Sequence, residues 1–174
     1  LLNRTKFQTV VKFLQPLLEV IRIGFNALAV KKTAFNAATS YTYHNALIGD
    51  YPDVSIDFSK VLISKGSLRG VENAIAASTQ AGKLELTWND NSALGFANAN
   101  DVSMIVAYHP ELEDAYYTLN GASRADASLV LDLPQSYSGS EVHVYMGFMA
   151  LTGSQSAAKK SISNSQYLGA VTIA

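Results

Sequence analysis

Apolar residues in the first 28 positions of the chain recur every three or four residues. The positions that carry this repeat are Phe7, Val10, Val11, Leu14, Leu18, Ile21, Phe25 and Leu28. A period of 3.6 residues places side chains on one face of an α-helix, so the pattern predicts an amphipathic helix over residues 4–28. Pro16 interrupts the pattern and lacks a backbone donor, which predicts a kink or a division into two helices.

A second helix is predicted over residues 33–47. Thr33 is a favourable N-cap, and Gly49 is suited to end the helix because glycine readily adopts the left-handed conformation. The two helical segments together predict a helical hairpin. The period then changes to two, which predicts a connecting strand over residues 54–58 that resumes at 61–63.

From Glu72 onward, apolar and polar residues alternate along the chain, as in Leu84, Leu86 and Trp88 with the polar residues between them. This is the period of a strand with one buried face. The predicted strands lie at residues 72–78, 83–88, 102–108, 114–119, 127–133, 141–150 and 165–173. Short strands at this spacing, with turn signals between them, are typical of an antiparallel sandwich.

The fold class that follows is α+β. We expect a helical hairpin and its connecting strand over residues 1–70, packed on or beside an antiparallel immunoglobulin or fibronectin type III-like β-sandwich over residues 71–174. Because a sandwich has its own core, the apolar stripe of the first helix needs another surface. It either packs within the chain or meets a neighbouring copy.

Two resemblances support this architecture. The segments "KLELTW", "VSMIVAY" and "LVLDLPQSYSGSEVHVYMGFMALTGSQS" resemble the second, third and later strands of immunoglobulin-like and fibronectin type III sandwiches. The segments "RTKFQTVVKFLQPLLEVIRIGF", "FNAATSY", "YPDVSIDFSKVLISKG", "LTWNDNS" and "VHVYMGFM" resemble an uncharacterised Bacteroidota family, carried as a domain of unknown function. This resemblance implies a surface or structural protein of a Bacteroidota cell and brings no catalytic residues.

Composition narrows the function classes. Thirteen basic and fourteen acidic residues give a net charge of −1, so a basic face for nucleic acid is not expected. The absence of cysteine removes disulfides, thiol catalysis and zinc–thiolate sites. No apolar run approaches the roughly 20 residues of a membrane span. Charged residues make up only 16% of the chain, which is common in extracellular β proteins and in subunits that bury their surface in an assembly.

The Asn- and Asp-rich tract that follows Trp88 is the segment most like a chemical site. Counted as a calcium loop from Asp90, it places Gly95 at position 6 and Asp101 at position 12. Leu94 stands at position 5, however, and cannot ligate. Asn and Asp also favour turns, so we expect a connection between two strands without a metal, in which Asp90→Ala and Asp101→Ala each cost little.

Other candidates for chemistry are weaker. Ser156–Lys159 matches an S-x-x-K pattern, but its companion motifs are missing. His44, His109 and His143 form no spaced pair that would ligate a metal. Acidic side chains follow His109 at Glu111, Glu113 and Asp114, where they are expected to charge a turn. We therefore expect no catalytic residues, no cofactor and no metal.

Three functional hypotheses remain. The first is a non-enzymatic subunit of an extracellular or cell-surface assembly, filament or pilus-like, that binds copies of itself through edge strands and helix contacts. The candidate assembly surface on the helix is Phe7, Val10, Val11, Leu14, Leu18, Ile21 and Phe25. The second is an adhesin-like module that binds surface glycans or other cell-surface proteins through Tyr116 and Tyr117, although neighbours on a strand point to opposite faces. A structural protein of a phage-like particle is a remote third.

Overall fold

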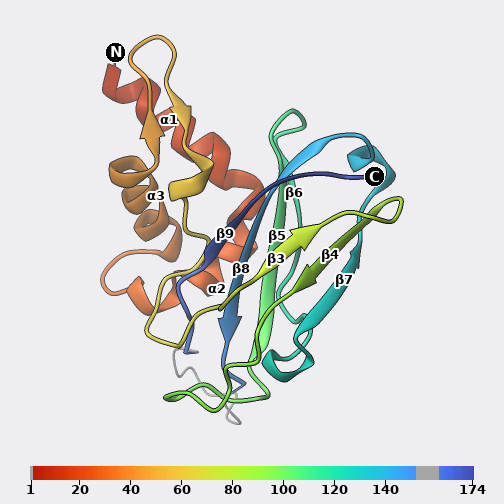
Figure 1. The fold of residues 1–174 in the computed structure, drawn as a ribbon. Coiled ribbons are helices and arrows are strands. Elements are labelled where there is room, and N and C mark those ends of the chain that lie inside the picture. Colours follow the sequence, from red (N-terminus) through yellow and green to blue (C-terminus); the bar gives the residue numbers. More distant parts are fainter. Residues whose placement is uncertain (1, 152–160) are drawn as a thin grey trace.

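A computed structural model describes residues 2–151 and 161–174. These residues form three layers, with helices on one side, a four-stranded sheet in the middle and a three-stranded sheet on the other side (Figure 1). The helical elements of the first layer are α1 (Leu2–Leu14), η1 (Gln15–Leu17), α2 (Leu18–Gly24), η2 (Asn26–Leu28) and α3 (Ala34–Asn45). None of the helices described is long and apolar enough to cross a membrane.

The helical hairpin follows the sequence prediction closely. Pro16 lies in the short 3₁₀ helix η1, which separates α1 from α2, because proline cannot supply the backbone donor that an unbroken helix needs. The Oγ1 atom of Thr33 accepts a hydrogen bond from the backbone N–H of Asn36 at 3.0 Å and so caps α3. The helix ends at Asn45 with Ala46 as its C-cap, so the prediction that Gly49 ends it is wrong; Gly49, with φ of 81°, lies beyond the next two residues, in the connection of a short hairpin.

Each of the seven predicted strand segments contains a strand. They are β3 (Ile75–Ala77), β4 (Lys83–Thr87), β5 (Val102–His109), β6 (Asp114–Thr118), β7 (Ser128–Asp132), β8 (Glu141–Met149) and β9 (Gln166–Thr172). All pairings between them are antiparallel, with the orders β3-β4-β7 and β6-β5-β8-β9. This arrangement is a fibronectin type III-like sandwich, and the predicted α+β fold is confirmed.

The four-stranded sheet is covered on both faces. All eight residues of β5 are buried, which explains why this strand lacks the polar alternation of a half-exposed strand. Ile105 and Ala107 face the core between the two sheets, whereas Val106 and Tyr108 contact the helices. The ring of Phe13 in α1 packs edge-on against Tyr108 with 4.8 Å between centroids. The helical hairpin is therefore a third layer on the outer face of the sheet.

The predicted connecting strand is largely wrong. Only β2 (Ser55–Ile56) forms, pairing with β1 (Leu47–Ile48), and a 3₁₀ helix, η3 (Phe58–Lys60), follows it. Residues 61–63 form no strand, and the N–H of Val61 instead donates to the carbonyl of Phe58 at 3.4 Å. The backbone N–H of Ile63 donates to the Oγ of Ser165 at 2.9 Å.

The same segment fastens the helical layer to the sandwich. Ser64 Oγ donates to the carbonyl of Ser163 at 2.8 Å, and the N–H of Lys65 donates to the carbonyl of Gly24 at 2.9 Å. A Cβ at Gly24 would collide with the carbonyl of Ile63, and one at Gly147 would lie 2.7 Å from Ser64 Oγ. Both glycines are therefore needed for the close approach of this segment.

Candidate functional site

The Asn- and Asp-rich tract between β4 and β5 is organised by a buried arginine. Arg124 begins the short 3₁₀ helix η4 (Arg124–Asp126), and its side chain is fully buried. Its Nε and Nη2 atoms donate to Oδ2 of Asp101 at 3.1 Å and 3.0 Å. Asp101 is itself only 1% exposed, so the two opposite charges pair out of contact with water.

The remaining donors of Arg124 reach the backbone and one amide side chain. Nη1 donates to Oδ1 of Asn91 at 2.6 Å, and Nη2 donates to the carbonyl of Arg69 at 2.9 Å. The guanidinium lies 4.0 Å from the ring centre of Phe148. Trp88 completes the cluster because its Nε1 donates to the carbonyl of Arg124 at 2.9 Å. With this set of partners, the buried guanidinium of Arg124 holds the tract in place on the sandwich.

These contacts correct one expectation and support another. Asp101 is not a dispensable loop residue, since its removal would leave Arg124 buried without its counter-charge. Asp90 is exposed and accepts a hydrogen bond from the backbone N–H of Ser92 at 2.9 Å, as in an Asx turn. The two carboxylates thus bind different groups of the protein, Arg124 for Asp101 and the Ser92 backbone for Asp90, as expected for a connection between two strands.

Calcium is therefore expected to leave the melting temperature of the wild-type chain unchanged. Asp90→Ala should shift this temperature by less than about 2 °C, since its carboxylate serves only an exposed turn. Asp101→Ala should lower it strongly, equally with calcium and with chelator. Thermal melts of the three proteins under both conditions check this. A chelator-dependent drop in the wild type that Asp90→Ala abolishes would contradict it.

The three histidines lie apart and each has its own surroundings. His44 is exposed on α3, with Nδ1 2.7 Å from the carbonyl of Ser40. His109 is buried at the end of β5, and His143 on β8 stacks on Phe58 with 3.9 Å between ring centres. Within the described residues, no group of three or more His, Asp or Glu side chains could hold a metal ion.

His143 should make the stability of the fold depend on pH. Burial lowers its pKa below the ordinary 6.5, although the nearby Glu141 carboxylate opposes this effect. The unfolded chain therefore takes up a proton more readily than the folded one as the pH falls. This contribution to stability is present above pH 6.5 and is lost as the pH drops through the folded-state pKa.

The measurement is the melting temperature of wild type and His143→Gln between about pH 7.5 and 5. We expect the difference between the two proteins to shrink as the pH falls. Parallel curves would show that His143 does not cause the dependence.

Glu111 and Glu113 lie in the turn between β5 and β6, as expected, whereas Asp114 is the first residue of β6 and pairs with His109. Glu113 pairs with Lys12 of α1 at 2.6 Å, and the hydroxyl of Tyr137 lies 3.4 Å from Oδ2 of Asp114. Glu111 is exposed. These contacts join the turn to the helical layer and to the sandwich.

Tyr116 and Tyr117 lie on opposite faces of β6. Tyr117 pairs with Val106 and packs against the helix-side cluster, whereas Tyr116 pairs with Ala107 and is 37% exposed. They therefore do not form a shared aromatic platform. The Ser156–Lys159 pattern lies outside the described residues.

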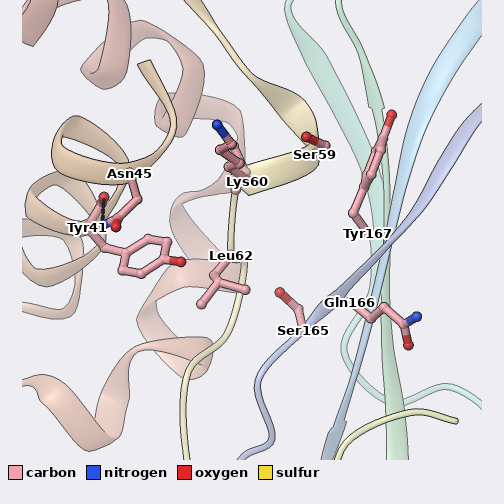
Figure 2. Close-up of a pocket in the computed structure, with 9 residues that line it drawn as sticks. Tyr41, Asn45, Ser59, Lys60, Leu62, Ser165, Gln166 and Tyr167 are labelled. Carbon is pink, nitrogen blue, oxygen red and sulfur yellow. Dashed lines mark hydrogen bonds between the residues drawn. The ribbon is translucent and has the colours of Figure 1, made fainter. Parts of the chain in front are cut away.

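A hollow of about 490 Å³ lies where the helical layer meets the edge strand β9 (Figure 2). Tyr41 and Asn45 of α3 lie on one side of it, with Ser165 and Tyr167 on the other. The lining residues are Tyr41, Asn45, Ser59, Lys60, Val61, Leu62, Ser165, Gln166 and Tyr167. No histidine or carboxylate is among them.

The polar groups of this hollow are engaged in structural contacts. The hydroxyl of Ser59 donates to Oδ1 of Asp57 at 2.5 Å, and Lys60 Nζ lies 3.4 Å from Oδ2 of the same residue. Ser165 Oγ holds the backbone N–H of Ile63. Two of the hydroxyls have a basic group within hydrogen-bond reach, since Ser59 contacts the carboxylate of Asp57 and the hydroxyl of Tyr167 lies 2.8 Å from Nδ1 of His143.

The structure divides the predicted assembly surface of the first helix. Four of its residues are fully buried, so this part of the stripe packs within the chain and not on a neighbouring copy. They are Val10, Leu14, Ile21 and Phe25. Their apolar stripe is covered by α3 and by the outer face of the four-stranded sheet. Val11 is half-buried, and two members remain outside. Those two are Phe7, 53% exposed, and Leu18, 44% exposed.

Phe7 and Leu18 each border a hollow beside α3. The first hollow, of about 310 Å³, is lined by Phe7, Asn36, Thr39, Ser40, Tyr43 and His44. The second, of about 240 Å³, is lined by Leu18, Glu19, Arg22, Thr33, Ala34 and Phe35. We call the first of these the α1–α3 groove. The outer surface of the helical layer thus carries both exposed apolar side chains and recesses beside them.

Two features escaped the sequence analysis. Arg124 is a single arginine within a polar turn, and nothing local distinguishes it from an exposed charge. Phe96 is 95% exposed in the tract between β4 and β5. Its signal was visible, because Leu94 and Phe96 interrupt an otherwise small and polar run.

Comparison with known proteins gives a family without an assigned function. Residues 2–169 match the model described as "Family of unknown function (DUF6266)". No curated protein matches the chain. Among solved structures, the chain is similar to the fn3 domain of the human collagen alpha-1(XX) chain, at 14% sequence identity and a TM-score of 0.44. That match covers 64% of this chain and 91% of the other, and it is a likeness of fold.

Proposed function

We propose that this chain, which belongs to the family of unknown function DUF6266, is a non-enzymatic structural subunit that associates with copies of itself. The assembly would be extracellular or on the surface of a Bacteroidota cell, as a filament or pilus-like structure. The observation that carries this proposal is the outer surface of the helical layer, where Phe7 and Leu18 stay exposed although most of their stripe is buried.

The distribution of reactive side chains favours binding over catalysis. His44 is on the helical layer, His109 is at one end of β5, and His143 is inside the helix–sheet junction. Acid–base and nucleophilic mechanisms need such groups within hydrogen-bond reach of one another. By contrast, exposed apolar side chains that gather on one surface mark protein contact sites, and Phe7 and Leu18 both lie on the helical layer.

Sedimentation velocity of the purified chain over a range of concentrations tests the proposal. Wild type should form species larger than a monomer, and Phe7→Ser combined with Leu18→Asn should reduce them at equal concentration. Ile75→Thr is the matched control, because Ile75 is 65% exposed on the edge strand β3, away from the helices. A wild-type chain that stays monomeric at every concentration would contradict the proposal.

Carbohydrate or cell-surface binding is the second candidate, and Tyr116 is the observation that favours it. Its ring is exposed on the edge strand β6, where a single sugar ring can stack on it. A glycan array with wild type and Tyr116→Ala tests this role, with the packed Tyr117 left intact. Loss of a specific signal in the variant supports glycan binding, and no signal in wild type removes it.

A further inference from the structure

The imidazole ring of His109 is enclosed at the end of β5, where the chain turns into β6. The residue is 1% exposed. Its Nδ1 accepts a hydrogen bond from the backbone N–H of Leu112 at 3.3 Å. Its Nε2 is buried and has no hydrogen-bond partner among the described residues. The turn over residues 110–113 is therefore closed by a side-chain nitrogen.

This geometry requires one protonation state of the ring. A nitrogen that accepts a backbone N–H carries no proton of its own, so the proton of neutral His109 lies on Nε2. A second proton can enter only at Nδ1, where it would point at the N–H of Leu112. The hydrogen bond that closes the turn is therefore incompatible with a protonated ring.

A carboxylate lies on the same face of the sheet as the ring. The ladder of β5 and β6 places His109 opposite Asp114, and the Cβ atoms of such opposed residues are about 5 Å apart. The ring of Tyr137, in the 3₁₀ helix η5 (Gln135–Tyr137), contacts His109 edge-on with 5.0 Å between centroids. The Tyr137 hydroxyl also reaches Asp114. A protonated His109 thus has a counter-charge close by.

The other titratable groups around the turn are engaged elsewhere or face away. Glu113 pairs with Lys12 of α1, and Glu111 is exposed. On the opposite face of the sheet, Tyr108 packs in the helix-side cluster, and His143 stacks on a ring of that cluster. Asp114 is therefore the carboxylate best placed to pair with a protonated His109.

We propose that His109 is a pH-sensitive switch for the turn between β5 and β6, a device that does not depend on self-association. In the neutral form, Nδ1 accepts the N–H of Leu112 and holds the turn. An imidazole ordinarily gains its second proton between about pH 8 and 5. The protonated ring then releases Leu112 and donates to Asp114 instead. Since Glu113 of the same turn binds Lys12, acid also loosens a link between the sandwich and the helical layer.

Nitrogen-15 NMR of the full chain follows the ring and the turn in one titration. At about pH 7.5, the ring shifts of His109 should show a proton on Nε2 and none on Nδ1. As the pH falls to about 5, the ring and the Leu112 amide should change with a common midpoint. The protection of the Leu112 amide from hydrogen exchange, relative to an unfolded chain at the same pH, should drop by at least about threefold.

Three variants separate the parts of the switch. His109→Asn keeps an acceptor, because Oδ1 can replace Nδ1 but takes up no proton, so Leu112 should stay protected across the range. Asp114→Asn removes the counter-charge and should move the common midpoint to lower pH. His143→Gln is the matched control, since its ring lies on the other face of the sheet and its loss should leave the midpoint unchanged.

The wild-type titration alone can overturn the switch, even if His109→Asn does not fold. If the ring gains its proton while Leu112 stays protected, His109 does not hold the turn. If the neutral ring carries its proton on Nδ1, or gains no second proton before the chain unfolds, the switch is also wrong. A chain that remains monomeric leaves the switch intact and contradicts only the proposed self-association.

Discussion

Replacing Arg124 with alanine is expected to lower the free energy of unfolding by about 3–5 kcal/mol. The loss comes from the groups that Arg124 leaves behind rather than from the ion pair alone. Asp101 would stay buried without its counter-charge, while Oδ1 of Asn91 and the carbonyl of Arg69 would lose their donors. Urea denaturation followed by the fluorescence of Trp88 measures the change.

Arg69→Ala is the matched control for this prediction. Arg69 carries the same charge near the same loop, but its side chain is 45% exposed and lies 3.7 Å from Glu72. Exposed ion pairs contribute little, so this variant should cost less than about 1 kcal/mol. The double variant Arg124→Ala and Asp101→Ala should cost clearly less than the sum of the two single changes. Additive costs would contradict a coupled buried pair.

Trp88→Ala is expected to destabilise the fold by a similar amount, about 3–5 kcal/mol. Trp88 is 4% exposed and packs edge-on against Phe148 with 6.1 Å between ring centres. The substitution opens a cavity between the two sheets and removes the donor to the carbonyl of Arg124. Thermal unfolding followed by circular dichroism measures this, since the variant loses the only tryptophan of the chain.

Trp88→Phe separates the two causes. Phenylalanine keeps most of the apolar volume but cannot donate to the carbonyl of Arg124, so its cost should fall between zero and that of Trp88→Ala. If Trp88→Phe destabilises as much as Trp88→Ala, the hydrogen bond rather than the packing dominates. If Trp88→Ala costs less than about 1 kcal/mol, the buried position of Trp88 is contradicted.

The strands could be predicted because apolar and polar residues alternate along them, and this alternation indicates which face of each strand is buried. Leu84, Leu86 and Trp88 repeat at period two, and the register of β4 with β7 places the first two in the core between the sheets. The helices were likewise visible, since Pro16 and Thr33 mark their ends by local chemistry. Local signals of this kind need no knowledge of distant contacts.

The buried pair of Arg124 and Asp101, which holds the loop between β4 and β5, could not be predicted in the same way. Arg124 meets partners 23 to 55 residues away in the chain, and an arginine is ordinarily exposed. Asp101 sits in a tract whose composition already suits a turn, which concealed its role. Only the folded chain shows that these two residues are buried together.

The sequence also did not show which surface covers the apolar face of the first helix. Periodicity shows that Val10, Leu14 and Ile21 share a face, but not what covers it. The best local clue was the apolar run 104–108 within β5, a strand whose eight residues are all buried. A strand buried on both faces needs a second cover, and the helical layer supplies it.

Electron microscopy of the concentrated wild-type chain tests the central claim of self-association most directly. The account predicts elongated particles in which one subunit repeats along a line, and their loss under the same conditions in the variant that combines Phe7→Ser with Leu18→Asn. If the wild-type protein shows only monomer-sized particles, and the Ile75→Thr control does so at the same concentrations, the account is contradicted.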